Sequence, residues 1–523
     1  MDWVKSLRER TWLLEALAAL AFFAAFVALH RYVGMRQIAG FDFGPMVHLA
    51  AQLSAGRHAN VDFISPYPPV FGWGLEFAFK WMGASWRSLV DLGGAFGALG
   101  AIAFFFVWRK LIPSWLAGVL AVVAAIQSVL FLGFWWYGPT VLWFSLLLVG
   151  LLAQKGAFTP ARAAAIAIFA ALLLLSKPNT AAPILLLGFL HLALPVRFAG
   201  RGKPLLALGA MASSVVLALL ACWALDFNVW AYARLLAQLS SRVGTPVALA
   251  QGLPWALDYQ ISGSIAFILA ILGFLFFGSI RAVAQNASAN GAWLCAALLL
   301  SFLASFFLNG EYPLASCPLI AAACALSAGR ALNGKQVAAI AVCWALAGIH
   351  AGVKAIDRDR VLSCGEGQFF EFGANVVQQD GFFKGVTTGP RFADFTSETG
   401  NALRVLAPKT VFFGPRVEFG YAQFGYAPPR GLPLWWDPKS AYPMTHDSAV
   451  AVVRAWKAAR FDLLVLDRDD ATFLQPEIMQ AIESDYLSVG PNFANHESSV
   501  YARRDWLAAR AARRAAQRAQ PAR

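Results

Sequence analysis

The segment that decides the fold is TWLLEALAALAFFAAFVALH, residues 11–30, in which Glu15 is the single Asp, Glu, Lys or Arg. About 20 mainly apolar residues are enough for a helix to cross the hydrocarbon core of a bilayer. No small-residue cleavage site followed by soluble sequence comes after this run, so we expect it to be retained rather than removed as a signal peptide. Residues 11–30 therefore predict a membrane-spanning helix.

The composition extends this prediction to most of the chain. Of the 523 residues, 59% are hydrophobic and 14% are charged, whereas soluble domains have about 25% charged residues. The 19 Trp and 42 Phe residues are typical of helices in lipid with aromatic rings near the interfaces. Further candidate spans are 88–108, 114–133, 137–154, 161–176, 180–195, 204–225, 261–280, 291–308, 313–329 and 336–353. We predict an α-helical polytopic membrane protein with about 11 spans.

The basic residues predict the orientation of these spans. The net charge is +13, but the Lys and Arg residues lie in short loops between apolar runs, so we expect no nucleic-acid partner. They precede the first span and follow the second, fourth, sixth, eighth and tenth. Placing all of these loops in the cytoplasm satisfies the positive-inside rule. This predicts a multi-pass protein of the cell inner membrane with a cytoplasmic N-terminus and a periplasmic C-terminal region.

One apolar stretch leaves a twelve-span alternative open. Residues 70–83 read VFGWGLEFAFKWMG and are short, with Glu76 and Lys80 among them. A twelfth span here would also place Arg109 and Lys110 on the wrong side of the membrane. We therefore interpret this stretch as an amphipathic helix lying on the outer surface.

The predicted domains follow from these spans. Residues 1–353 form the membrane domain with exterior loops 31–87 and 226–260, residues 354–508 form an exterior domain, and 509–523 form a basic tail. Predicted strands at 410–415, 462–467 and 499–504 alternate with predicted helices at 445–460 and 475–486. This order indicates a small α/β domain. The basic tail is either solvated or in contact with anionic lipid head groups.

The first exterior loop contains the strongest candidates for chemistry. It reads AGFDFGPMVHLAAQLSAGRHANVDFISPYPPVFGWGLEF over residues 39–77, with Asp42 shortly after the first span. A carboxylate at a membrane surface is costly unless it has a function. The alternative is that Asp42 caps the short helix that follows it. Further along the same loop comes Tyr67-Pro68-Pro69.

Four short motifs, taken in order, resemble the GT-C superfamily, in the branch of protein O-mannosyltransferases and lipid A aminoarabinose transferases. They are Asp42, Tyr67-Pro68-Pro69, Ser176-Lys177-Pro178 and Glu311-Tyr312-Pro313-Leu314. The resemblance implies that residues 1–353 are a glycosyltransferase domain acting in cell envelope biogenesis. It implies transfer of a sugar from a polyprenyl-phosphate donor to an acceptor hydroxyl on the periplasmic side by an inverting single displacement.

The resemblance also implies roles for individual residues. Asp42 is the expected general base, with Asp62 in reserve. Lys177 is expected to bind the donor phosphate, together with Arg234 and Arg242. The expected cavity-lining residues are His48, Tyr67, Trp136, Tyr137, Glu311 and Tyr312.

Each of these roles has a structural alternative. Lys177 at a helix end is equally typical of a lysine that reaches toward the membrane surface. The two arginines are also typical of ordinary loop charges, and His48 of a core or solvated histidine. The aromatic run FWWYGP at 134–139 suits either a sugar-stacking surface or an interfacial aromatic belt.

The same run departs from the pattern of the aminoarabinose transferases, which have an acidic residue in that loop. Its absence puts a bound divalent metal in doubt, and we expect no cofactor, with a metal left open. The expected partners are a polyprenyl-phosphate-linked sugar, a lipid, glycan or protein acceptor, and membrane lipids. Two other functions remain open: a transporter or flippase of a lipid-linked saccharide, and a non-catalytic assembly factor of the envelope.

Overall fold

The computed structural model describes most of the chain. The described ranges are 2–36, 43–131, 133–154, 159–178, 181–182, 184–186, 188, 204–243, 376–414, 417–434, 446–467, 476–489 and 498–519. Asp42, Glu311 and Tyr312 lie outside them. So do the expected spans 261–280, 291–308, 313–329 and 336–353 and most of 180–195.

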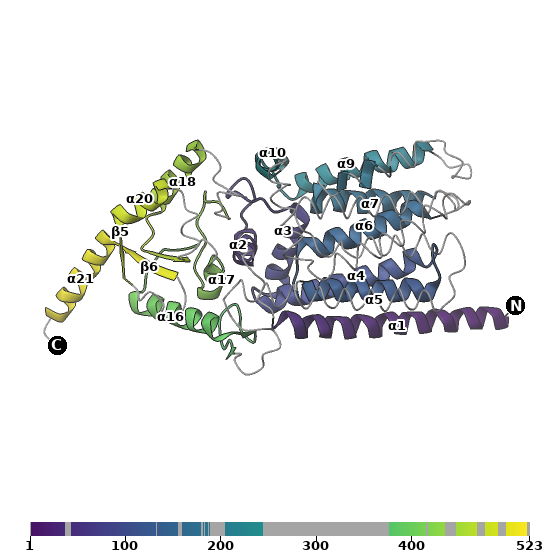
Figure 1. The fold of residues 1–523 in the computed structure, drawn as a ribbon, viewed down its shortest axis with the longest axis horizontal. Coiled ribbons are helices and arrows are strands. Elements are labelled where there is room, and N and C mark those ends of the chain that lie inside the picture. Colours follow the sequence, from purple (N-terminus) through teal and green to yellow (C-terminus); the bar gives the residue numbers. More distant parts are fainter. Residues whose placement is uncertain are drawn as a thin grey trace, which may run out of the picture.

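Long apolar helices form a bundle in which they lie side by side (Figure 1). They are α1 (Asp2–Gly34), α4 (Trp86–Trp108), α5 (Ser114–Phe131), α6 (Tyr137–Ala153), α7 (Pro160–Ser176) and α9 (Pro204–Ala224). The bounds of the last five coincide closely with predicted spans, and α1 contains the predicted span 11–30 but begins nine residues before it. Local capping explains where two of them begin: the Ser85 side chain accepts from the Ser88 amide at 3.2 Å, and the Thr159 side chain accepts from the Arg162 amide at 3.2 Å.

The apolar helices identify the chain as a membrane protein. Within the described ranges, Leu13–Gly34 and Trp86–Trp108 are long and apolar enough to cross a bilayer. The pair Leu208–Ala224 and Val229–Ala237, bent by 111°, is a third span if both pieces belong to one broken helix. Helices α6 and α7 are apolar but have 17 residues each. The expected total of about 11 spans stays a prediction.

Ion pairs agree with the predicted direction of the first spans. Arg109 follows α4, and its guanidinium lies 2.9 Å from the carboxylate of Glu15 in the first half of α1. The end of α4 therefore lies beside the beginning of α1, so the two helices are antiparallel. The Arg31 side chain near the end of α1 lies 2.7 Å from Asp91 near the beginning of α4. A chain that enters the membrane through α1 thus returns through α4.

Shorter helices lie at the end of the bundle where α1 ends (Figure 1). They are α2 (Phe43–Ser54), α3 (Pro69–Phe77) with the π-helical turn η1 (Ala78–Met82), and α10 (Val229–Val243). At about 1.5 Å per residue, the nine residues of α3 and the five of η1 together reach about 21 Å. The stretch at 70–83 is therefore too short to cross the hydrocarbon core.

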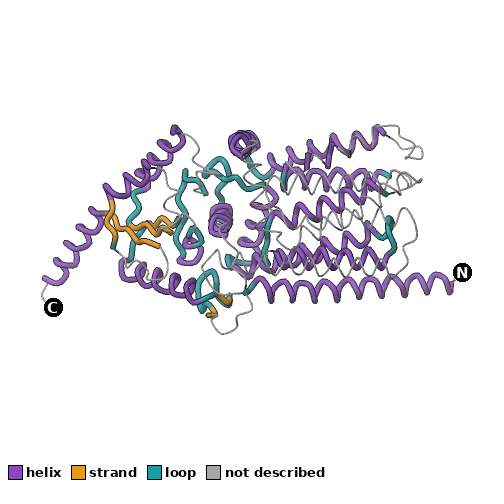
Figure 2. Tube along the Cα trace, in the orientation of Figure 1, coloured by secondary structure: helices purple, strands orange, loops and turns teal. Residues whose placement is uncertain are grey.

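The C-terminal part contains a mixed four-stranded sheet in the order β3-β4-β6-β5, which lies away from the bundle (Figure 2). The strands are β3 (Val411–Phe413), β4 (Leu463–Asp467), β5 (Tyr486–Ser488) and β6 (Ser498–Arg503). The β3–β4 pair is parallel, and β6 is antiparallel to both β4 and β5. The helices are α16 (Pro390–Leu406), α17 (Gly420–Phe424), α18 (His446–Ala459), α20 (Pro476–Asp485) and α21 (Arg504–Ala519). A two-residue pair, β1 (Val376–Val377) and β2 (Thr387–Thr388), precedes α16.

Strand β4 is buried on both faces. Leu464 and Leu466 pack with Trp456 of α18 on one side, while Leu463 and Val465 pack with the α16 and α17 side chains on the other. A strand covered on both faces reads as a continuous apolar run rather than an alternating one. This explains the sequence LLVL between Asp462 and Asp467.

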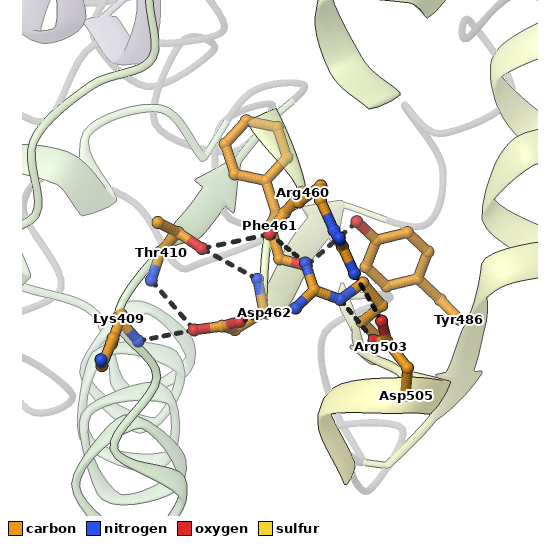
Figure 3. A network of polar contacts seen from close by, with 8 residues as sticks. All are labelled: Lys409, Thr410, Arg460, Phe461, Asp462, Tyr486, Arg503 and Asp505. Carbon is orange, nitrogen blue, oxygen red and sulfur yellow. Dashed lines mark hydrogen bonds and ion pairs between the residues drawn. The ribbon is translucent and has the colours of Figure 1, made fainter. Parts of the chain in front are cut away.

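A polar network joins the ends of three strands of this sheet (Figure 3). The Asp462 carboxylate accepts from the Lys409 amide at 2.8 Å and the Thr410 amide at 3.3 Å. It also lies 3.2 Å from the Arg503 guanidinium, which in turn lies 2.6 Å from Asp505. Since these contacts connect the starts of β3 and β4 to the end of β6, they fix the pairing of the three strands.

The C-terminal part packs against the end of α1 and the start of α2, in the loop predicted to be exterior. The Phe43 ring at the start of α2 lies 5.1 Å from the Phe419 ring and 6.0 Å from the Phe383 ring, measured between centroids. The Thr387 amide donates to the Met35 carbonyl at 2.8 Å. This packing agrees with the prediction that the first loop and the C-terminal part lie on one side of the membrane.

Helix α21, which begins within the predicted exterior domain and continues through most of the basic tail, lies at the end of the molecule farthest from the bundle (Figure 1). The Arg513 and Arg514 side chains on it are exposed. The described part of the tail thus lies away from the apolar bundle, and its contact with solvent or with lipid stays a prediction.

Candidate functional site

The aromatic segment before α6 is held tightly against α3 and the start of α4. The indole of Trp135 donates to the Phe71 carbonyl at 3.0 Å, and the Trp135 amide donates to the Leu89 carbonyl at 2.9 Å. A Cβ atom at Gly74 would overlap the Trp135 ring. Only glycine therefore allows α3 to approach this closely, and the approach places Phe71 against the rings that follow Trp135.

Tyr67, Phe71, Trp136, Tyr137 and Lys177 come together at this point, and we call them the Lys177 cluster. Ring centroids are 6.3 Å apart for Tyr67 and Trp136, 5.2 Å for Phe71 and Trp136, and 4.5 Å for Trp136 and Tyr137. The Lys177 Nζ atom lies 5.5 Å from the Tyr137 ring centroid, within the range of a cation–π contact. Four predicted site residues, from three separate segments, thus meet at one end of the bundle.

Burial distinguishes this cluster from a surface feature. Lys177 is 6% exposed, Trp136 6% and Tyr67 5%. An ammonium group buried to this extent is costly unless its surroundings compensate the charge. The Lys177 backbone amide donates to the Leu173 carbonyl at 2.9 Å, so the residue ends α7. The end of α7 therefore holds the Lys177 side chain in a fixed position beside the aromatic rings.

A cavity of about 230 Å³ lies between α2, α3 and the turn from α9 to α10. Its lining includes Tyr67, which also belongs to the Lys177 cluster. The charged lining residues are Arg57, Glu76, Lys80 and Asp226. Because ligand pockets commonly measure about 300–1,000 Å³, this cavity suits one small polar group, such as a phosphate or a single sugar ring.

Asp62 lies in a tight turn between α2 and α3, which its carboxylate stabilises. Its carboxylate accepts from the His58 amide at 2.9 Å, and its carbonyl accepts from the Gly431 amide at 2.9 Å. The lining of the 230 Å³ cavity, as far as the described chain forms it, does not include Asp62. The residue expected as the reserve base is thus engaged in connecting the first loop to the C-terminal part.

His48 is buried away from the cavity and is 2% exposed. Its ring lies 4.8 Å from the Tyr421 ring between centroids. The Gln52 amide nitrogen lies 3.0 Å from His48 Nε2, so it donates to that nitrogen when Nδ1 holds the proton. Burial, with a smaller contribution from the charge of Arg57, lowers the pKa of His48 to about 3. The ring is therefore neutral and acts as part of the packing between α2 and α17.

Polar side chains near His48 also form hydrogen bonds with the C-terminal part. The Gln52 side chain donates to the Pro429 carbonyl at 2.8 Å. The Arg57 guanidinium donates to Gln52 Oε1 at 2.5 Å and to the Pro428 carbonyl at 2.6 Å. Burial lowers the pKa of Arg57. Arg57 therefore reaches from the cavity lining to the C-terminal part.

The two arginines expected at the donor phosphate lie on α10. Arg234 is exposed, and the side chain of Arg242 lies outside the described part of the chain. The neighbouring Tyr232 is buried, with its ring 5.3 Å from that of Phe227 between centroids. Phe227 lines the cavity, so α10 begins at the cavity while Arg234 faces outward.

Comparisons with known proteins give distant structural likeness. No protein-family model matches the chain, and no curated protein matches it. The oligosaccharyltransferase of Archaeoglobus fulgidus, in complex with Zn and sulfate, is similar with a TM-score of 0.44 and 13% identity, covering 92% of this chain and 73% of that one. ArnT from Cupriavidus metallidurans in the apo state is similar with a TM-score of 0.40 and 13% identity, covering 95% of this chain and 98% of that one. At TM-scores below 0.5 and 13% identity, neither likeness carries an argument about this chain.

Proposed function

We propose that this chain is a GT-C-type membrane glycosyltransferase that moves a sugar from a polyprenyl-phosphate donor to an acceptor hydroxyl on the periplasmic side of the inner membrane. The observation that carries the proposal is the Lys177 cluster, in which a buried cation and aromatic rings meet at one end of the apolar bundle. A cation at that depth suits an anionic lipid phosphate, and the rings suit a sugar or a prenyl chain.

In this mechanism Lys177 stabilises the leaving group. As the bond between the anomeric carbon and the phosphate oxygen breaks, negative charge develops on the polyprenyl phosphate. A fixed ammonium group in a water-poor site stabilises such charge more strongly than water does. Tyr137 lies beside this ammonium group, so its ring limits the positions that Lys177 adopts.

The general base is assigned to Asp42. The acceptor hydroxyl loses its proton to this carboxylate, its oxygen forms the new bond to the anomeric carbon, and polyprenyl phosphate leaves from the opposite face. One displacement inverts the configuration and needs no covalent intermediate. Asp42 directly precedes Phe43, which is 5% exposed at the start of α2. Asp62 stays the reserve base, although its carboxylate accepts an amide hydrogen bond in the turn.

The 230 Å³ cavity supports a polar entrance beside the cluster. Tyr67 belongs to both, and the cavity lining has charged groups of both signs, Arg57 and Lys80 with Glu76 and Asp226. We assign this side to the entry of the acceptor from water. Arg234 and Arg242 on α10 are assigned to outer contacts with the donor phosphate.

The test compares matched carboxylate variants of the full chain in lipid nanodiscs. Asp42→Asn is isosteric and removes the proton acceptor, so transfer from a polyprenyl-phosphate hexose should fall at least 100-fold. Asp62→Asn is the matched comparison: it should keep most of the activity if Asp42 is the base, whereas loss of transfer in Asp62→Asn alone would assign the role to the reserve base. The anomeric configuration of the product should be inverted relative to the donor. Unchanged transfer by Asp42→Asn, or retention of configuration, would contradict the mechanism.

A further inference from the structure

A second and larger cavity lies in the C-terminal part, between β1, α16 and α17. Its volume is about 990 Å³, at the upper end of the about 300–1,000 Å³ that is common for ligand pockets. It shares no lining residue with the 230 Å³ cavity or with the Lys177 cluster. The proposed transfer reaction leaves this cavity without a role.

Three nearly buried polar side chains contribute to its lining: Gln378, Thr396 and Gln423 are 7%, 6% and 9% exposed. Gln378 donates to the Thr388 hydroxyl at 2.7 Å and accepts from the Thr396 hydroxyl at 3.1 Å. Gln423 accepts from the Phe383 amide at 3.2 Å. These side chains are therefore held in fixed orientations, which is how a pocket defines the position of a ligand.

One side of the cavity is aromatic. Phe424 and Tyr426 are half-buried lining residues. Their rings lie 5.7 and 6.0 Å from the Phe413 ring of β3, measured between centroids. Each ring is thus supported from β3. Burial raises the pKa of Tyr426, so its hydroxyl remains a neutral donor and acceptor.

Exposed polar residues of the lining supply hydrogen-bonding groups of mixed charge, beside the exposed Val376 and Val377. Asp380 and Asp394 are acceptors, Arg404 is a donor, and the Ser397 hydroxyl is both. Two carboxylates against one guanidinium disfavour a phosphate or another polyanion. A sugar has hydroxyl groups that need hydrogen bonds and C–H faces that pack on aromatic rings. The polar side chains and the two aromatic rings of this cavity suit both.

We infer that this cavity, formed by β1, α16 and α17, is a binding site for a neutral oligosaccharide. The site is separate from the transferase centre and does not rest on the proposed function. Asp394 and Arg404 approach the ligand from α16, while Tyr426 packs against a sugar face. Occupancy would hold a glycan on the C-terminal part of the molecule.

The test uses the full chain in lipid nanodiscs, because sugar-based detergents would compete for the site. Isothermal titration calorimetry with neutral tri- and tetrasaccharides of glucose, galactose, mannose and N-acetylhexosamine should detect binding to at least one series. Asp394→Asn and Tyr426→Ala should each weaken that binding at least tenfold. Glu398→Gln is the matched control, because Glu398 is an exposed carboxylate of the same helix that does not line the cavity, and it should leave binding unchanged.

Three results would overturn the inference. They are an absence of binding across the whole panel at millimolar sugar, binding that Asp394→Asn and Tyr426→Ala leave unchanged, and tighter binding of sulfated than of neutral saccharides. Asp394 is exposed, so its replacement by Asn tests the site even if the Tyr426 variant is poorly folded. Binding that persists in Asp42→Asn separates this site from the transfer reaction.

Discussion

The Lys177 ammonium group lies 5.5 Å from the centre of the Tyr137 ring, which joins the end of α7 to the start of α6. Both residues belong to helices whose other ends lie far from the C-terminal part (Figure 1). A buried cation in contact with an aromatic face at this end of an apolar bundle is the feature from which the proposed chemistry follows.

The first prediction concerns the charge of Lys177. Lys177→Met keeps the length of the side chain but removes the ammonium group, so transfer should fall by about 100- to 1,000-fold, the usual effect of deleting one group that stabilises developing charge. Lys177→Arg should retain part of the activity. Release of free polyprenyl phosphate measures both. Lys110→Met is the control, because Lys110 is an exposed lysine that follows the end of α4. An equal loss of transfer in that variant would contradict a specific role for Lys177.

The second prediction concerns the close approach of α3 to Trp135. Gly74→Ala places a Cβ atom in the Trp135 ring, so we expect a loss of about 1–3 kcal/mol of stability from overpacking. Gly209→Ala on α9 is the matched control, because nothing lies within 4 Å of the added atom. Thermal unfolding in nanodiscs should show a lower midpoint for the first variant only. Equal midpoints would mean that the packing around Trp135 is looser than described.

The third prediction concerns the sheet. Asp462→Ala leaves two backbone amides without their acceptor and removes one of the two carboxylates at the Arg503 guanidinium, so we expect a loss of about 1–3 kcal/mol. Hydrogen exchange should therefore increase in β3, β4 and β6. Asp505→Ala removes a carboxylate that is 56% exposed, so it should cost less than about 1 kcal/mol. Equal protection in both variants would contradict the structural role of Asp462.

The fourth prediction follows from the burial of His48. Its folded-state pKa is about 3, below the unfolded value of about 6.5, so between these values the unfolded chain binds the extra proton. The contribution of His48 to the free energy of unfolding is therefore constant above about pH 6.5 and falls as the pH drops below that value. From pH 7.5 to pH 5 His48 should contribute a loss of about 2 kcal/mol, at about 1.4 kcal/mol per pH unit.

Comparison with His48→Leu isolates this contribution. The variant should lose less stability than the wild-type chain over the same pH range, because it has no histidine to protonate at this position. Denaturant unfolding at the two pH values measures the difference. Parallel losses in the two proteins would mean that the His48 ring is accessible to protons in the folded state.

Local sequence patterns predicted the positions of several helices and strands. The limits of α4, α6, α7 and α9 follow from long apolar runs, with capping side chains at the starts of α4 and α7. The positions of β3, β4 and β6 follow from short apolar runs. The short α3 at the end of the bundle follows from Glu76 and Lys80, which form an ion pair at 2.6 Å.

The candidate site was predictable in part. Tyr67, Trp136, Tyr137 and Lys177 were identified individually from motifs and aromatic content, and the structure brings them together. Asp226 in the cavity lining and the central position of Phe71 were missed, because neither has a local signal. His48 was expected at a cavity, but its burial depends on Tyr421, which is 373 positions away in the chain. The roles of Asp42, Glu311 and Tyr312 stay predictions.

The most direct test of the central claim is the stoichiometry of a single reaction. Purified chain in nanodiscs receives a polyprenyl-phosphate hexose labelled in both the sugar and the lipid, together with hydroxyl-bearing acceptors. The account predicts one free polyprenyl phosphate for each sugar transferred, with both products lost in Asp42→Asn and Lys177→Met. Movement of intact donor between the two leaflets, with no bond broken and no effect of Asp42→Asn, would contradict it and identify the chain as a flippase.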